Sequence, residues 1–174
     1  MTAGIGDLIA SRLRDVPDFP QPGVLFKDIT PLLADAPAFA AVIEALASAA
    51  GEVDLIAGIE ARGFLIAGAL GAALHRGIVP VRKAGKLPPP TVRRAYDLEY
   101  GTAEIEVPVD AVAGKRVLVV DDVLATGGTM RAAADLIVEA GGSLAGLAVL
   151  LELGFLDGRA ALAGLPEVTA LLTV

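Results

Sequence analysis

The residues best suited to chemistry lie close together in the segment 117–129. Val117–Val120 is a run of four apolar residues, three of them β-branched, and two acids, Asp121 and Asp122, follow it directly. Adjacent carboxylates can accept hydrogen bonds from the vicinal hydroxyls of a sugar such as ribose, and they can help to hold a divalent cation. A buried strand that ends in two acids therefore predicts a sugar-binding site.

The loop after the acids is suited to bind a phosphate. Residues 123–129 supply successive backbone N–H groups, and the Thr-Gly-Gly-Thr sequence at 126–129 adds two hydroxyls and two glycines that let a ligand approach the backbone. A helix expected to begin near Gly128 would direct the positive end of its dipole to the same place. A helix cap alone would explain one acid but not the whole pattern, so we favour a ligand site.

Strands and helices alternate along most of the chain and would position this segment. The apolar patterns predict strands at 54–58, 78–82, 117–120, 147–151 and 168–173, and helices at 61–74 and 130–140. Such alternation is typical of an α/β domain with a mainly parallel sheet flanked by helices. Ligands bind beyond the carboxyl ends of the strands in such sheets, which is where Asp121 and Asp122 are expected.

Two parts of the chain depart from this alternation. The N-terminal part predicts a helix around Ile5–Leu13, an irregular segment with Pro17, Pro20 and Pro22, and a second helix from Asp35 to Gly51. The segment 83–106 contains three consecutive prolines and many charges, which is typical of a functional loop. Residues 91–98 and 102–107 could also pair as a hairpin.

Composition and charge exclude several classes of site. The 174 residues, enough for one domain, include no cysteine and one histidine, so thiolate chemistry and multi-histidine metal sites are excluded. A net charge of -7 disfavours nucleic-acid binding. The longest uncharged runs hold 12 residues, whereas a membrane-spanning helix needs about 20. The N-terminal residues show no signal pattern, so a cytoplasmic protein without a membrane segment is expected.

The segment 117–129 resembles the phosphoribosyl pyrophosphate (PRPP) motif of the type I phosphoribosyltransferases. Four more segments look like the adenine-specific members of that family, and together they extend the resemblance over about residues 19–158. They are FPQPGVLFKDITP at 19–31, GIEARGF at 58–64, RKAGKLP at 82–88 and YDLEYG at 96–101.

The resemblance implies a fold, a reaction and partners. It implies a single type I phosphoribosyltransferase domain over residues 1–174, with an N-terminal helix and purine-binding hood at about 1–34 and a flexible catalytic lid at about 88–106. The implied reaction is adenine plus PRPP giving AMP plus pyrophosphate, in purine salvage, through an oxocarbenium-like transition state. The implied cofactor is Mg²⁺, bound mainly through PRPP with no direct protein ligand, and the implied assembly is a homodimer.

The resemblance also assigns roles to residues. It implies PRPP binding by Arg62, Gly63, Arg82, Lys83, Lys86, Asp121, Asp122, Ala125, Thr126, Gly127, Gly128 and Thr129. It implies adenine binding by Val24, Leu25, Phe26 and Lys27, and catalytic roles for Glu99, Tyr100, Asp121 and Asp122. Within this assignment Glu99 would handle the purine proton or stabilise the charge on ribose, and Tyr100 would cover the site.

Two other functions are compatible with the same motif. The base could be a 6-oxopurine, although the hood motif argues against it. The chain could instead be a regulator that senses PRPP, although such proteins usually carry a nucleic-acid surface. The roles of Arg93 and Arg94 stay open between pyrophosphate binding and simple solvation, and Glu152 stays open between the base pocket and a strand edge. His75 is expected to end a helix without a catalytic role.

Overall fold

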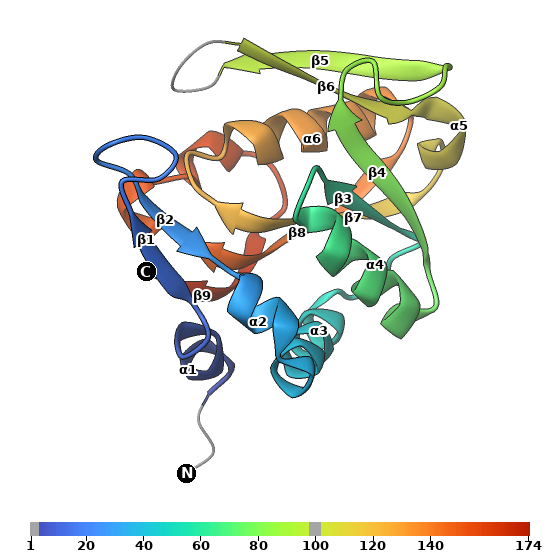
Figure 1. Cartoon of the computed structure of the whole chain (residues 1–174). Coiled ribbons are helices and arrows are strands. Elements are labelled where there is room, and N and C mark those ends of the chain that lie inside the picture. The colour runs from blue at the N-terminus through green and yellow to red at the C-terminus, as the bar shows by residue number, and fades with distance from the viewer. Residues whose placement is uncertain (1–3, 98–101) are drawn as a thin grey trace.

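A computed structural model describes residues 4–97 and 102–174, and a seven-stranded sheet forms the centre of this part of the chain (Figure 1). The strand order is β5-β6-β4-β3-β7-β8-β9. The parallel strands are β3 (Leu55–Ile59), β4 (Gly77–Lys83), β7 (Arg116–Leu124), β8 (Ser143–Glu152) and β9 (Val168–Thr173). The predicted α/β fold with a mainly parallel sheet is confirmed.

A hairpin extends the sheet beyond β4. Strands β5 (Thr91–Asp97) and β6 (Thr102–Pro108) pair antiparallel, and β6 pairs antiparallel with β4. The hairpin considered for this segment is therefore present. The short helix α5 (Val109–Val112) follows it and was not predicted.

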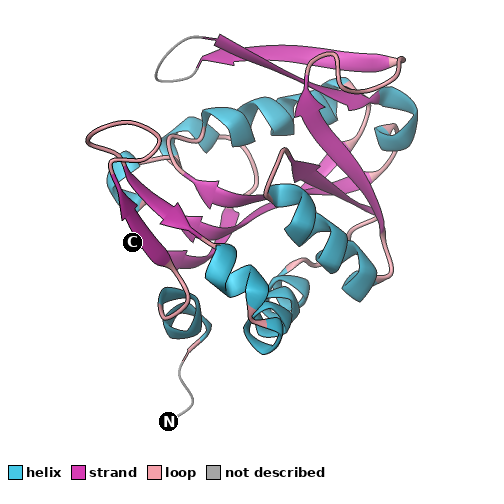
Figure 2. Ribbon diagram, in the orientation of Figure 1, coloured by secondary structure: helices cyan, strands magenta, loops and turns pink. Residues whose placement is uncertain are grey.

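Helices cover both faces of the sheet (Figure 2). Helices α3 (Ala36–Ala49) and α4 (Gly63–Leu74) pack on one face, whereas α6 (Gly128–Glu139) packs on the other face and beneath the hairpin. Helix α1 (Ile5–Ala10) packs against β9. The side chains of β7 alternate between the two resulting cores, with Val117 and Val119 in one and Leu118 and Val120 in the other. A strand buried on both faces explains the continuous apolar run in the sequence.

The N-terminal segment contains more regular structure than the prolines predict. Strands β1 (Arg14–Pro17) and β2 (Leu25–Asp28) form a separate two-stranded sheet, and helix α2 (Thr30–Ala34) follows. The predicted irregular segment is present, because Pro17 ends β1 and Pro20 and Pro22 lie between the strands, but the two short strands that flank it were not predicted. We call the β1–β2 hairpin and its connecting segment the hood.

Strand β7 is longer than predicted and includes both acids. Its pairing with β3 ends at Val120, but its pairing with β8 continues to Leu124 opposite Glu152. Asp121 and Asp122 therefore lie in the last part of the strand and not after it. They lie beyond the last pair between β3 and β7, which joins Gly58 and Val120, and this leaves room beside them for the loop that follows β3.

The chain ends with short elements around β9. Two 3-10 turns, η1 (Gly154–Leu156) and η2 (Ala160–Leu162), connect β8 to β9. Across the described ranges 4–97 and 102–174, every helix is too short or too polar to cross a membrane.

Candidate active site

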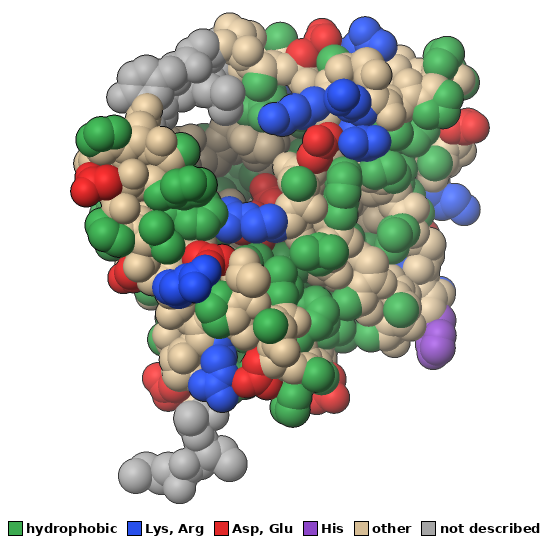
Figure 3. Space-filling model, in the orientation of Figure 1, with side chains coloured by type: hydrophobic (Ala, Val, Ile, Leu, Met, Phe, Trp, Pro, Cys, Tyr) green, Lys and Arg blue, Asp and Glu red, His purple; other side chains and the backbone are tan. Residues whose placement is uncertain are grey.

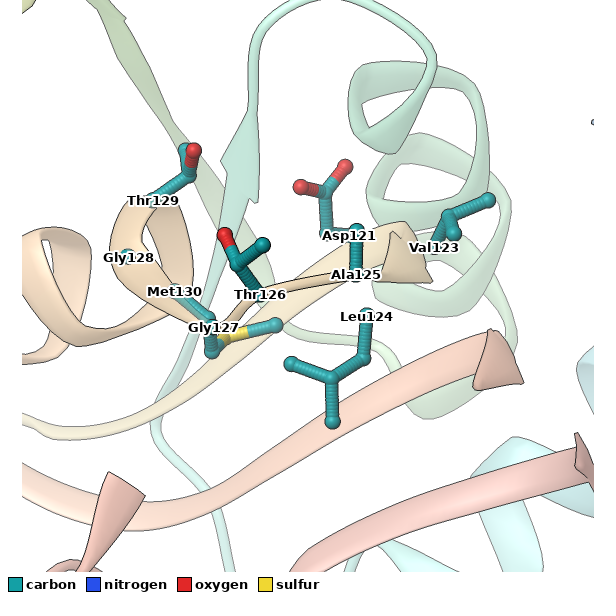
Figure 4. A pocket seen from close by; sticks show the side chains of 9 residues that line it. All are labelled: Asp121, Val123, Leu124, Ala125, Thr126, Gly127, Gly128, Thr129 and Met130. Atoms are coloured by element: carbon teal, nitrogen blue, oxygen red, sulfur yellow. The ribbon is translucent and has the colours of Figure 1, made fainter. Parts of the chain in front are cut away.

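The loop between β7 and α6 encloses a small pocket with polar groups on one side (Figure 4). Its lining runs from Asp121 to Met130 without Asp122. The Asp121 carboxylate and the hydroxyls of Thr126 and Thr129 lie on the same side of the loop, whereas Leu124 and Met130 point away from them and are buried in the core. The loop leads into the N-terminus of α6, which begins at Gly128. This arrangement of N–H groups, hydroxyls and a helix dipole fits a phosphate.

The two acids of β7 lie in different surroundings. Asp122 is 6% exposed, and its Oδ2 lies 2.7 Å from Nε of Arg62. Asp121 lines the pocket, and its Oδ1 accepts a hydrogen bond of 2.8 Å from the Asp122 backbone N–H. Burial, followed by the neighbouring Asp122 charge, raises the pKa of Asp121 well above its ordinary value. Asp122 is therefore held in an ion pair with Arg62. The ionised form of Asp121 would be stabilised by any positive charge that enters the pocket.

Arg62 connects the acids to the hood. Besides its ion pair with Asp122, its guanidinium lies 4.9 Å from the centre of the Phe26 ring, and its Nη1 donates to the Lys27 carbonyl at 3.5 Å. A cation over an aromatic ring adds about 0.5–2 kcal/mol of attraction. The one side chain thus contacts both the strand that carries the acids and the strand that forms the hood.

Gly63 allows the loop after β3 to approach β7. A Cβ at this position would lie 3.0 Å from Oδ1 of Asp121 and 3.0 Å from the Val120 carbonyl oxygen. A larger residue would push the first turn of α4 away from the acids. Arg62 and Gly63 therefore lie beside the two acids, and their binding of PRPP stays a prediction.

Glu60 anchors the basic segment at the end of β4. Its Oε2 accepts a hydrogen bond from the Lys83 backbone N–H at 3.0 Å and lies 3.3 Å from Nε of Arg82. The Lys83 hydrogen bond is the main cause of a lowered Glu60 pKa, although burial opposes it. Basic side chains gather over the region between β4 and β5 (Figure 3). The predicted cluster of Arg82, Lys83 and Lys86 thus lies next to the loop that carries Arg62.

The segment after this cluster is fixed by a buried carboxylate. Glu106 is fully buried in β6 and accepts hydrogen bonds from the backbone N–H groups of Lys86 and Leu87, at 2.8 and 2.9 Å. Burial alone would raise the pKa of Glu106, but these hydrogen bonds, with Thr91 and Arg93, hold it below its ordinary value. Sequence reasoning placed Glu60 in a motif but did not predict its contacts with the basic segment, and it missed Glu106, whose spacing does not distinguish it from a surface acid.

The hood encloses a second, more apolar hollow of about 380 Å³. Phe19 and Phe26 meet edge to face there, with ring centres 5.1 Å apart, and Arg62 closes one side. Among the predicted adenine-binding residues, Phe26 lines this hollow and Leu25 is half exposed. The Nζ of Lys27 instead lies 2.7 Å from Oδ1 of Asp15. Base contacts by Val24, Leu25, Phe26 and Lys27 stay predictions. Phe19 is an additional lining residue of the hollow, and the same motif contains it.

Other singled-out residues have different surroundings. Glu99 and Tyr100 lie outside the described residues, so their catalytic roles stay predictions. Arg93 pairs with Glu106 at 3.0 Å, and Arg94 lies 3.3 Å from Glu139 and 3.5 Å from Asp135 of α6. Arg93 therefore pairs within the hairpin, from β5 to β6, whereas Arg94 joins the hairpin to α6. His75 caps the C-terminus of α4 in a left-handed conformation and is exposed, so the prediction that it ends a helix is confirmed.

Comparison with known proteins gives one consistent result. The model of the phosphoribosyl transferase domain matches residues 32–161. The chain is 61% identical to the adenine phosphoribosyltransferase of Streptomyces coelicolor, over 98% of this chain and 97% of that protein. The chain belongs to the adenine phosphoribosyltransferase family.

Solved structures of adenine phosphoribosyltransferases share the fold over nearly the whole chain. The enzyme of Thermoanaerobacter pseudethanolicus is 48% identical, with a TM-score of 0.92 and coverage of 97% of this chain and 99% of that one. The enzyme of Saccharomyces cerevisiae, complexed with adenine and an imino-altritol bisphosphate, is 38% identical, with a TM-score of 0.90 and coverage of 97% and 98%. As an adenine phosphoribosyltransferase, this chain is a pentosyltransferase.

Proposed function

We propose that this adenine phosphoribosyltransferase transfers the 5-phosphoribosyl group of PRPP to adenine and releases AMP and pyrophosphate. The observation that carries the proposal is the position of Arg62, which contacts Asp122 and Phe26 and so lies between the phosphate pocket and the hood. The yeast relative, solved with adenine and a sugar bisphosphate mimic, supports the same pair of ligands. Purine salvage is the process in which such a reaction would operate.

The proposed reaction breaks one bond and forms another at the anomeric carbon of ribose. The bond from C1 to the pyrophosphate oxygen breaks, and its electron pair leaves with pyrophosphate, while a ring nitrogen of adenine attacks C1 and loses its proton. Positive charge develops on the ribose ring beside Asp121 and Asp122, and negative charge develops near Arg62 and the basic segment that begins at Arg82. Charged side chains that the fold already holds at such positions lower the activation barrier, because they stabilise the developing charges without having to reorient during the reaction. Glu99 stays the predicted residue for the purine proton.

Mg²⁺ is part of the proposal, and the donor chemistry of the site fits it. Asp121 presents a carboxylate to the pocket, and Mg²⁺ prefers oxygen ligands and usually keeps several waters and substrate phosphates. Asp121 would face the cation through water, because Mg²⁺ is expected to bind mainly through PRPP without a direct protein ligand. When bound, the cation would neutralise charge on the diphosphate of PRPP.

A homodimer is the assembly that we propose, and the exposed surface of α4 and β4 supports it. Leu65 of α4 is 55% exposed, and Ile78 at the start of β4 is 54% exposed. Hydrophobic side chains cover much of this region of the surface (Figure 3). Exposed apolar surface of this kind is typical of protein–protein contacts. The cytoplasmic location stays a prediction.

The proposal is tested by identifying the product. The protein is incubated with adenine, PRPP and Mg²⁺, and the nucleotide formed is identified by chromatography against authentic AMP. We expect AMP in amounts equal to the pyrophosphate released, loss of product with excess EDTA, and recovery when Mg²⁺ is added back. Release of free ribose 5-phosphate without AMP would contradict the transfer reaction, and full activity in EDTA would contradict the role of Mg²⁺.

A further inference from the structure

Two arginines hold the segment that lies behind the phosphate pocket. Arg159 makes a two-pronged ion pair with Glu152, with Nε at 2.7 Å from Oε1 and Nη2 at 2.8 Å from Oε2. Its Nη1 also donates to the Val168 carbonyl at 3.0 Å. From the other side, Nη1 of Arg131 on α6 donates to the carbonyls of Ala161 and Ala163 at 3.2 and 3.3 Å. The segment 157–163, here called the buttress, is therefore held at Arg159 and at its C-terminal end.

The buttress touches the phosphate loop through backbone atoms. A Cβ at Gly158 would overlap the Ala125 carbonyl oxygen, and a Cβ at Gly127 would overlap the Gly158 carbonyl oxygen and lie 2.9 Å from Cβ of Ala161. Gly127 also has a φ of +84°, which disfavours any residue with a side chain. The close approach of the two backbones therefore requires glycine at both positions, because a side chain at either one would collide with the other segment.

The Glu152 carboxylate, which pairs with Arg159 to hold the buttress, is itself buried and fixed by further contacts. Glu152 is 7% exposed, sits opposite Leu124 at the end of β7, and also accepts a hydrogen bond from the Thr173 hydroxyl at 3.2 Å. Bidentate arginine–carboxylate pairs fix direction as well as distance. A displacement of Arg159 would therefore move its neighbour Gly158, and with it the loop at Ala125 and Gly127.

We propose that Glu152 and Arg159 are positioning residues that hold the phosphate loop in the shape that binds the 5′-phosphate of PRPP. They touch no substrate and act through Gly158. This inference rests on the proposed function, because it takes the loop 125–129 to be the phosphate-binding element. It assigns Glu152 to neither of the roles that the sequence left open, the base pocket or a simple strand edge.

The test compares two arginines that pair with carboxylates near opposite ends of β7. Arg159→Met removes the pair beside the phosphate loop, and the control Arg116→Met removes the pairs with Glu52 and Asp54 at the start of the strand. For each protein kcat and the KM values for PRPP and adenine are measured, with circular dichroism to check folding. We expect Arg159→Met to raise the KM for PRPP by about tenfold with the KM for adenine within about twofold, whereas Arg116→Met changes neither.

Two further variants keep the test decisive if Arg159→Met does not fold. Glu152→Gln preserves shape but removes the charge, and Gly158→Ala places a methyl group against the Ala125 carbonyl. Either should raise the KM for PRPP selectively in folded protein. An unchanged KM for PRPP in the folded variants, or an equal effect in Arg116→Met, would overturn the inference. The wild-type protein reports on the proposed function separately, because it must form AMP whatever the variants do.

Discussion

Nε of Arg62 lies 2.7 Å from Oδ2 of Asp122, and this ion pair joins the loop after β3 to the end of β7. The pair brings together two segments that are about 60 residues apart in the sequence. Asp122 is almost completely buried, so its charge is screened little by solvent, and removal of either partner leaves a charge without its counterpart. Variants of Asp122 and of Arg62 test this ion pair from its two sides.

Asp122→Asn should weaken the use of PRPP without unfolding the domain. The loss of the charge that pairs with Arg62 at a buried position costs about 1.5–3 kcal/mol, which corresponds to roughly a 10- to 150-fold fall in kcat/KM for PRPP. Steady-state kinetics at varied PRPP measures the effect. The control is Asp54→Asn, which removes an acid paired with Arg116 at the opposite end of the sheet and should leave kcat/KM unchanged. Unchanged turnover in Asp122→Asn would show that this carboxylate has no part in the reaction.

Arg62→Lys should raise the KM values for both substrates. Lysine lacks the planar guanidinium that reaches Asp122 and lies over Phe26 at once, so contacts on both sides are lost. We expect a rise of at least about fivefold for each substrate, equivalent to about 1 kcal/mol per contact. The matched change Arg82→Lys should affect PRPP alone, because Arg82 contacts Glu60 and Lys86 but not the hood. Equal kinetic profiles for the two variants would contradict the linking role of Arg62.

The acid side of the stability profile should depend in part on Asp28. Hydrogen bonds from Thr30, together with Arg14, lower the pKa of Asp28 from 3.8 to about 2 in the folded protein. Because the folded pKa is depressed, this carboxylate contributes stability above about pH 4 and loses that contribution as the pH falls to about 2. Urea unfolding of the wild type and Asp28→Asn should show a stability difference that shrinks over this range. A constant difference would contradict the assignment, and Glu44→Gln, at an exposed position, is the control.

Leu65→Glu should convert a dimer to a monomer if α4 forms the interface. A buried charge without a partner opposes association, so the variant should sediment as a single chain of about 17.6 kDa, whereas the wild type sediments as twice that mass. Val138→Glu changes another exposed hydrophobic residue, on α6, and should leave the dimer intact. A monomeric wild type would refute the assembly, and a dimeric Leu65→Glu would place the interface elsewhere.

The sequence predicts the parts of this fold that depend on local patterns. The apolar run at Val117–Val120 predicts a buried strand, and the glycines at 127 and 128 predict the turn into α6, because short-range geometry alone requires them. The strand still extends to Leu124, because its pairing with β8 continues after the apolar run has ended. Such tertiary pairing leaves no local signal.

The residues of the candidate site can be predicted from the sequence only where they belong to a recognisable motif. Arg62 and Asp122 belong to recognisable segments, but their contact with each other and with Phe26 depends on how β3, β7 and the hood come together. The roles of Glu106 and Glu152 depend on partners brought close by folding, so their spacing in the sequence gives no indication. The structure adds these contacts between residues that are far apart in the sequence.

The most direct test of the account is pyrophosphate release from PRPP in the presence of Mg²⁺ with different bases. Parallel reactions contain adenine, hypoxanthine, guanine, xanthine or no base, with the protein at the same concentration. The account predicts release with adenine alone. Release with a 6-oxopurine in place of adenine would contradict the assignment of the hood to adenine, and no release with any base would contradict the transfer reaction itself.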